Sequence, residues 1–178
     1  DLLQVQGDTV CVNSISASIL VKGTNKGVFY QAYENTTLLG NAVLSNGGDT
    51  VLTIPIVGSS LTPGLHKIKI VSGVQECELV TLKELADLYI NDLPSLDLNV
   101  SDTTICSNST SAFIHVFNTK PSETYLALLN NSPISLPVVS AGGKVSLEIQ
   151  RNNLSLDTNL VSIQTSIPGC GDALLKKT

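Results

Sequence analysis

Cysteine and histidine are the side chains in this chain that are best suited to chemistry. There are four cysteines and two histidines, namely Cys11, Cys77, Cys106, Cys170, His66 and His115. Zinc sites need close spacings such as C-x-x-C or H-x-x-x-H. Here the cysteines of each half are 66 and 64 residues apart, and the histidines are 49 apart. The spacing favours disulfide bonds, and we expect no metal site and no cofactor.

The cysteines form two equivalent pairs because the sequence repeats itself at a fixed offset of 95 residues. Cys11 matches Cys106, and the match continues without a gap to Ile70; Cys77 then matches Cys170 after a shift of two residues. We therefore predict the disulfides Cys11–Cys77 and Cys106–Cys170, one inside each copy. The alternative is four free, buried thiols in a reducing cell. Disulfides of this kind indicate an oxidising location outside the cytoplasm.

Catalysis is not expected from the remaining residues. No Gly-x-Ser-x-Gly turn is present, so a serine nucleophile is not supported. Gly47-Gly48 and its match Gly142-Gly143 are typical of tight turns rather than of a phosphate-binding loop. His66 has the inward parity of its predicted strand and is expected to be a satisfied rim or core histidine, whereas His115 is expected on a solvated outer face. We expect the chain not to be an enzyme.

The overall composition excludes several classes of partner. Hydrophobic residues make up 42% of the 178, charged residues 14%, and the net charge is −5 without a basic run. Nucleic acid and anionic membrane surfaces are therefore unexpected partners. No apolar stretch is long enough for membrane insertion.

Apolar and polar residues alternate with period two, which predicts strands half buried in a sheet. In the first copy the odd positions from Cys11 through Ile15 to Val21 share one face. Further strands are expected at 28–33, 38–44, 50–56 and 65–71, with matches in the second copy. With the leading segments 2–6 and 96–100, each copy has about seven strands, which favours an antiparallel β-sandwich.

The repeat predicts two tandem domains, 1–92 and 93–178. A short, stiff linker is expected between them, made of Asn91, Asp92, Leu93, Pro94 and Ser95. Residues 82–89 have both helical and alternating spacing, and we favour a closing strand. The second copy stops at Thr178, opposite Leu85, so its match to 86–90 is absent. We interpret the second domain as lacking its last strand, either because the chain was cut or its tail is disordered, or because a partner donates a strand.

Two kinds of ligand site are conceivable from the sequence, one for calcium and one for glycans. Asp92, Asp97 and Asp102 could bind calcium near the joint, although solvated surface acids are the simpler interpretation. Exposed aromatic residues suited to glycans are scarce, and Phe29, Tyr33 and Phe113 are the candidates at outward parity.

In both copies the order of motifs resembles the Ig-like repeats of large surface adhesins secreted by Bacteroidota, including gliding-motility adhesins of the SprB type. The resemblance covers nearly the whole chain, and in the second copy it follows the segments Asp102–Cys106, Tyr125, Gly142-Gly143, Leu147, Ile149, Leu156 and Cys170. It implies type IX secretion, a bacterial cell-surface location, and neighbouring repeats of the same polypeptide as partners. Asp8-Thr9-Val10, Asp49-Thr50-Val51 and Asp102-Thr103-Thr104 also resemble the short O-glycosylation signal of that phylum.

From these observations we expect a structural stalk or spacer in a cell-surface adhesin, acting in adhesion and gliding motility. The alternatives are a module that binds a surface polysaccharide or another cell-surface ligand, and an accessory module of a secreted enzyme.

Overall fold

The computed structural model describes residues 3–74 and 77–176. Within these ranges the chain is built from strands, with one short 3-10 turn at Arg151–Asn153. The all-β prediction is confirmed. The chain divides into two compact units, and each is described by itself: unit 1 is Asp1–Asp92 with Pro168–Cys170, and unit 2 is Leu93–Ile167 with Gly171–Thr178. Independent folding of the two copies stays a prediction.

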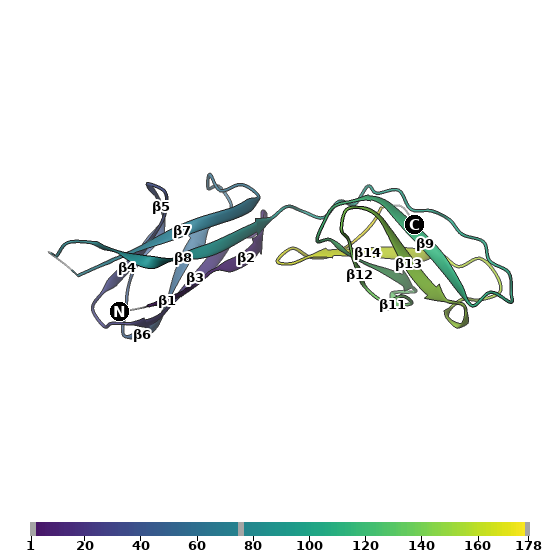
Figure 1. Cartoon of the computed structure of the whole chain (residues 1–178), viewed down its shortest axis with the longest axis horizontal. Helices are drawn as coiled ribbons and strands as arrows, with labels where there is room; N and C mark the ends of the chain where they lie inside the picture. The colour runs from purple at the N-terminus through teal and green to yellow at the C-terminus, as the bar shows by residue number, and fades with distance from the viewer. Residues whose placement is uncertain (1–2, 75–76, 177–178) are drawn as a thin grey trace. The chain divides into compact units, whose positions relative to one another are not determined.

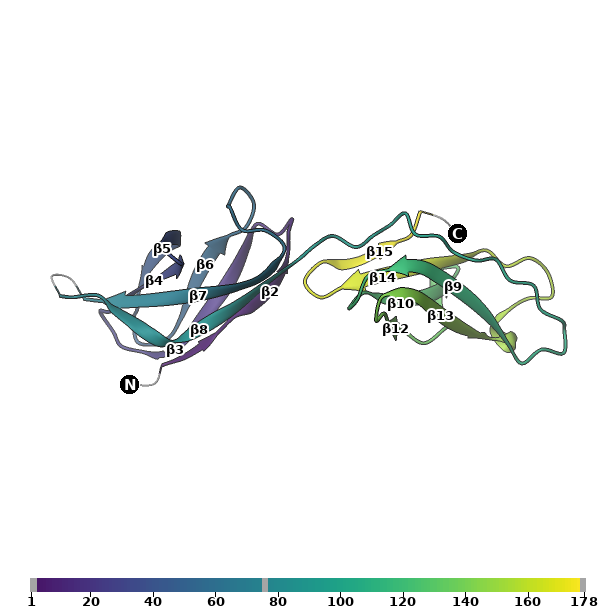
Figure 2. The ribbon, with the colours of Figure 1, turned by 45° about the horizontal axis from the view of Figure 1, so that its top comes forward.

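Unit 1 is a sandwich of a three-stranded sheet, β1-β3-β6, and a five-stranded sheet, β2-β8-β7-β4-β5. Figures 1 and 2 show the two layers. Neighbouring strands are antiparallel, except that β2 runs parallel to β8. The strands are β1 (Gln4–Gln6), β2 (Asp8–Cys11), β3 (Ser16–Thr24), β4 (Phe29–Glu34), β5 (Thr37–Leu44), β6 (Gly48–Pro55), β7 (Gly64–Gly73) and β8 (Val80–Asn91). The favoured strand over 82–89 is therefore confirmed.

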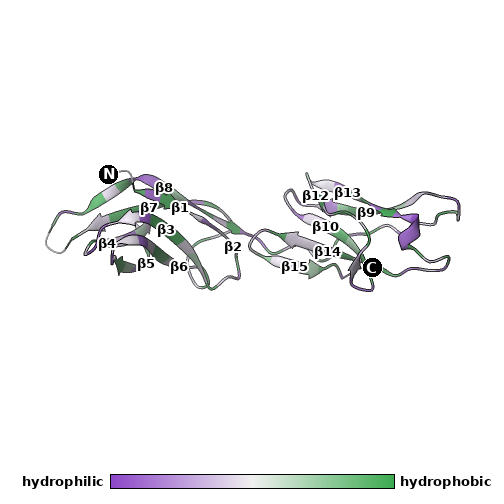
Figure 3. Cartoon of the chain, turned by 90° about the horizontal axis from the view of Figure 1, so that it is seen from below, coloured by the Kyte–Doolittle hydropathy of each residue, from purple (hydrophilic) through white to green (hydrophobic). Residues whose placement is uncertain are grey.

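The core of unit 1 follows the predicted alternation. On β6 the residues Leu52 and Ile54 are buried while their neighbours are exposed, and on β3 the buried Ile19 and Val21 alternate with exposed or half-buried residues. Figure 3, which is coloured by hydropathy, shows hydrophobic segments in green along the strands of this unit. Because period two places successive side chains on opposite faces, these residues pack against the apolar face of the other sheet.

One part of the inward pattern is wrong. Ile15 was predicted on the buried face but is 84% exposed. The strand does not run on from Cys11, because β2 ends there and the Ser14 amide donates to the Cys11 carbonyl at 2.9 Å in a turn. The alternation starts afresh at Ser16, where β3 begins.

Gly7 lies where the chain passes from β1 in one sheet to β2 in the other. A Cβ at this position would lie 1.8 Å from the Asp87 carbonyl oxygen of β8. The backbones therefore approach each other so closely that only glycine fits.

A buried hydroxyl cluster holds the turn between β5 and β6. The Oγ1 of Thr24 lies 2.6 Å from Ser45 Oγ and 2.8 Å from Thr50 Oγ1. The second copy keeps one such pair, Thr119 and Ser140, 2.7 Å apart. Each side chain is 5% exposed or less, so these hydrogen bonds satisfy groups that water does not reach.

Unit 2 repeats the two-layer design, and its matches to β5, β7 and β8 are shorter. A two-stranded sheet, β13-β9, faces a sheet in the order β11-β10-β14-β15, in which β12 also pairs with β10. The strands are β9 (Ser111–Thr119), β10 (Thr124–Leu129), β11 (Ser132–Pro133), β12 (Val138–Val139), β13 (Gly143–Gln150), β14 (Val161–Ile167) and β15 (Gly171–Leu174). The predicted leading strand at 96–100 is reduced to a single bridge, Val100 with Val116.

Candidate functional site

A disulfide bond joins Cys11 to Cys170, with an S–S distance of 2.06 Å and a Cα–Cα distance of 4.6 Å. Cys11 ends β2, and Cys170 belongs to the turn between β14 and β15. The two are 159 residues apart in sequence. The bond therefore links an early cysteine of the first copy to the late cysteine of the second.

The prediction of one disulfide inside each copy is wrong. In unit 1, Cys11 pairs with Asn91 at the far end of β8, while Cys77 precedes the near end of that strand. β8 has 12 residues and spans about 36 Å at 3.3 Å per residue, so Cys11 and Cys77 lie far beyond the roughly 7 Å that a disulfide allows between Cα atoms.

The same reasoning applies to Cys106 and Cys170 in the second copy. Cys106 lies in the loop before β9, and its neighbours Ile105 and Ser107 line the same groove as Val161, the first residue of β14, whereas Cys170 follows the end of β14. Cys77 and Cys106 are free thiols, and both are exposed.

The turn that carries Cys170 packs closely on the ends of β2 and β8 within unit 1. The Asn91 side-chain amide donates to the Pro168 carbonyl at 2.8 Å. A Cβ at Gly169 would lie 2.7 Å from the Thr9 carbonyl oxygen, and its φ of +78° also favours glycine. The disulfide is thus part of a shaped contact rather than an isolated bond.

The residues predicted as linker begin at the end of β8 and lead into unit 2. Asn91 is the last residue of β8, and Asp92 and Leu93 are exposed. The Ser95 amide donates to Glu123 Oε1 at 3.3 Å. The end of the linker is therefore tied to unit 2 by a buried carboxylate.

Glu123 is 1% exposed, and its Oε2 also accepts the hydroxyl of Tyr125. Burial of the phenol, together with the hydrogen bond to Glu123 and the negative charge of Glu123, raises the pKa of Tyr125 well above its usual 10. The first copy has Val28 in place of Glu123, so sequence equivalence gave no sign of this cluster.

Both histidines have hydrogen-bond partners. His66 Nδ1 lies 2.5 Å from Glu34 Oε1, and His66 Nε2 lies 2.7 Å from the Thr62 carbonyl oxygen. Burial alone would lower the pKa of His66, but the hydrogen bonds to Glu34 and Thr62 and the charge of Glu34 outweigh it and raise the pKa above 6.5. The expectation of a satisfied histidine is confirmed. His115 is half-buried on β9, with Nδ1 2.9 Å from Ser146 Oγ.

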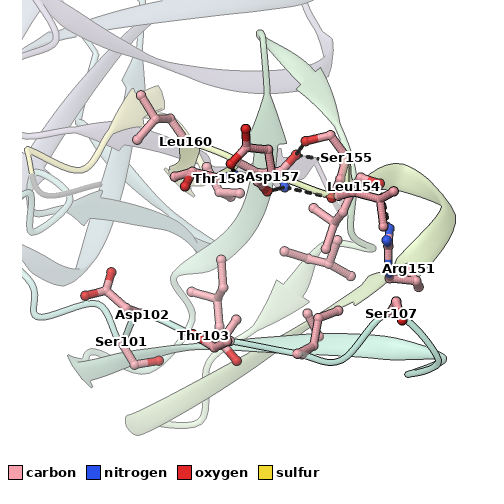
Figure 4. Close-up of a pocket in the computed structure, with 18 of the residues that line it drawn as sticks. Ser101, Asp102, Thr103, Ser107, Arg151, Leu154, Ser155, Asp157, Thr158 and Leu160 are labelled. Atoms are coloured by element: carbon pink, nitrogen blue, oxygen red, sulfur yellow. Dashed lines mark hydrogen bonds between the residues drawn. The ribbon is translucent and has the colours of Figure 1, made fainter.

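A groove of about 580 Å³ opens in unit 2 between the segment 100–107 and the segment 151–161. Figure 4 shows Asp102 and Thr103 on one side and Ser155–Leu160 on the other. Core residues Ile114 and Ile149 line it. Leu156 here is 86% exposed, whereas its match in unit 1, Leu61, is 6% exposed.

A shortened closing strand accounts for this groove, because β15 pairs with β14 as β8 pairs with β7 but is much shorter. In unit 1, Ala86, Leu88 and Ile90 of β8 join the core beside the residues that match Ile114 and Ile149. In unit 2, β15 is only four residues long, and residues 103–106, which match β2, form no strand. The last strand of unit 2 is therefore shortened rather than absent, and the groove beside it has both polar and apolar walls.

A second groove, of about 540 Å³, lies beside the outer face of β9 and β13. Phe113, which is 47% exposed, lines it together with the polar residues Ser146, Glu148 and Asn153. Among the predicted aromatic candidates, Phe29 and Tyr33 are half-buried instead, and Tyr33 lies under Lys69 Nζ at 5.4 Å.

The acids considered for calcium do not come together. Asp97 forms an ion pair with Lys176 at 2.9 Å, and Asp102 lies exposed beside the first groove. In residues 3–74 and 77–176, no cluster of three or more histidine, cysteine or acidic side chains is placed to hold a metal ion. Of the three glycosylation-like motifs, the one at Thr50 has a buried, hydrogen-bonded hydroxyl, while Thr9 and Thr103 are exposed.

The strand order defines the class of protein. β3 and β6 face β4, β7 and β8, with β5 as an added edge strand, which corresponds to strands B and E opposite C, F, G and C′ of an Ig-like sandwich. The described part of the chain contains no helix long and apolar enough to cross a membrane. An Ig-like sandwich with a disulfide is a structural or binding module of the extracellular type.

No family model and no curated protein matches this chain. Among solved structures it is similar to murine CEACAM1b (12% identity, 93% of each chain covered, TM-score 0.48). It is also similar to the human OSCAR ligand-binding domain (8% identity, 94% and 89% covered, TM-score 0.41). A third is the N-terminal Ig1-2 module of the Drosophila receptor protein tyrosine phosphatase DLAR (13% identity, 99% and 96% covered, TM-score 0.36). These similarities are too low to carry an argument, so the class rests on the strand order.

Proposed function

We propose that this chain is a spacer segment of an extracellular bacterial surface adhesin, in which tandem Ig-like repeats hold a distal adhesive region away from the cell. The observation that carries the proposal is the Cys11–Cys170 disulfide, because it links two copies of one repeat. Such a bond persists in an oxidising environment and restrains the copies that it joins.

The resemblance of Asp102–Cys106 and the motifs after it to Bacteroidota adhesin repeats supports a more specific version. In that version the parent protein leaves the cell by type IX secretion, carries further repeats of this kind, and acts in adhesion and gliding motility. The chain itself catalyses no reaction in this proposal.

Surface display is the first test. An antibody raised against this chain should label intact cells of the source organism, and protease added outside should remove the signal. Signal that appears only after lysis would overturn the proposal.

A replacement experiment separates a spacer from a ligand-binding module. Deletion of this segment from the parent protein should reduce adhesion, and an unrelated pair of sandwich domains of similar length should restore it. Failure of the replacement, with surface display intact, would contradict a pure spacer role.

The second candidate is a glycan-binding module, favoured by Phe113 beside Ser146, Glu148 and Asn153 in the outer groove of unit 2. An exposed ring next to polar groups is the arrangement that sugar faces require. Saturable binding on a glycan array that is lost in Phe113→Ala, but kept in Phe117→Ala on the same strand, would support it.

A further inference from the structure

The two free cysteines occupy the positions in the repeat that form the disulfide elsewhere in this chain. Cys77 matches Cys170, since each lies in the turn that follows the sixth predicted strand of its copy, and Cys106 matches Cys11. Both free thiols are exposed. We call Cys11 and Cys106 the early cysteines and Cys77 and Cys170 the late cysteines. In the observed bond, the late cysteine of one copy is joined to the early cysteine of the copy before it.

We propose that Cys77 and Cys106 each form a disulfide of the Cys11–Cys170 type with a flanking copy of this repeat. Cys77 bonds to the early cysteine of a preceding copy, and Cys106 bonds to the late cysteine of a following copy. The proposal rests on the proposed function, in which the chain is part of a longer array.

The contacts around Cys11 and Cys170 in unit 1 define the surroundings that each of the two bonded cysteines needs. The acceptor side is the end of β2 beside the end of β8, where Asn91 holds the Pro168 carbonyl and Thr9 approaches Gly169. The inserted side is a short turn that ends in cysteine. In unit 1 the acceptor cysteine, Cys11, is already bonded, and Cys77 has a free thiol.

The two late cysteines are preceded by different residues, and this difference affects how closely the chain can approach the acceptor side. The second copy has Pro168-Gly169 before its late cysteine, whereas the first copy has Gln75-Glu76. A Cβ at the Gly169 position meets backbone at 2.7 Å. A Pro-Gly sequence before the cysteine should therefore fit an acceptor built from residues 1–95 better than the natural Gln75-Glu76 sequence.

The chemistry is an ordinary two-electron oxidation. Two thiols lose two protons and two electrons as one S–S bond forms, and glutathione disulfide accepts them and becomes two molecules of glutathione. Cysteines outside the cell or in the periplasm meet oxidants of this class during export.

The test is a three-repeat protein in which residues 1–95 precede the full chain 1–178, so that the natural spacing of the repeat is kept. After oxidation with glutathione disulfide and unfolding in denaturant, free thiols are counted by maleimide labelling and mass spectrometry. Of six cysteines, we expect two free thiols and a peptide that links the first Cys11 to the central Cys77.

Two variants complete the design. Cys77→Ser in the central copy should leave three free thiols, and the double change Gln75→Pro/Glu76→Gly should speed bond formation at Cys77. Four free thiols in both the natural and the Pro-Gly protein would overturn the proposal. If antibody labels intact cells but the three-repeat protein has four free thiols, the disulfide between repeats is refuted and the proposed function stands. If the disulfide forms but the antigen is found only inside cells, the proposed function is refuted.

Discussion

Loss of the Cys11–Cys170 bond is expected to destabilise the chain strongly. The bond closes a loop across a sequence separation of 159 residues. The chain-entropy model gives about 5 kcal/mol at 25 °C for a loop of this length, because the cross-link removes conformations from the unfolded chain. For a protein of this size, that corresponds to a melting temperature lower by roughly 10 to 20 °C.

Differential scanning calorimetry of the oxidised protein and of Cys11→Ser/Cys170→Ser measures this effect. The matched control is Cys77→Ser/Cys106→Ser, which removes two exposed free thiols and should melt with the natural chain. Peptide mapping without reduction should find Cys11 linked to Cys170. Coincident melts of the two double variants, or a Cys11–Cys77 peptide, would refute the reasoning.

Four further outcomes are expected. The raised pKa of His66 beside Glu34 should give stability that is full below pH 6.5 and lost as pH rises through the folded pKa; urea unfolding from pH 5.5 to 9 checks this, and an equally steep fall in His66→Phe would contradict it. Gly7→Ala should cost several kcal/mol or prevent folding, because its Cβ would overlap the Asp87 carbonyl; a chemical melt matching that of the exposed control Gln6→Ala would rule this out. Thr24→Val should cost about 1–3 kcal/mol in the same assay, because buried hydroxyl and carbonyl partners lose a hydrogen bond. A peptide of residues 84–92 should raise the melting temperature of the chain by filling the groove of unit 2, and a scrambled peptide should not.

The period-two pattern predicted the central strands of both copies because it follows burial, but the strand expected at 96–100 is only a bridge. Leu52 and Ile54 in one copy and Leu147 and Ile149 in the other are all 1% exposed or less, as their spacing indicates. The predicted burial of Ile15 was wrong because the period-two pattern does not reveal the turn after Cys11.

The disulfide could not be assigned from spacing, because spacing does not give strand direction. The pairing follows from the parallel run of β2 along β8, which puts Cys11 at the far end from Cys77. One signal was present: the strand predicted between Cys77 and the linker separates that cysteine from the end of the copy. Leu156 shows the same limit, since it matches Leu61 in sequence but is 86% exposed, whereas Leu61 is 6% exposed.

The Cys11–Cys170 bond also decides how a pull on the polypeptide would travel. Tension follows the shortest covalent route, which here runs from the residues before Cys11 through the two sulfurs to the residues after Cys170. In this chain by itself, the residues between the two cysteines form a closed ring that lies off that covalent route. Such a tether would stay nearly inextensible while oxidised, and a reductant would release the hidden length of the ring.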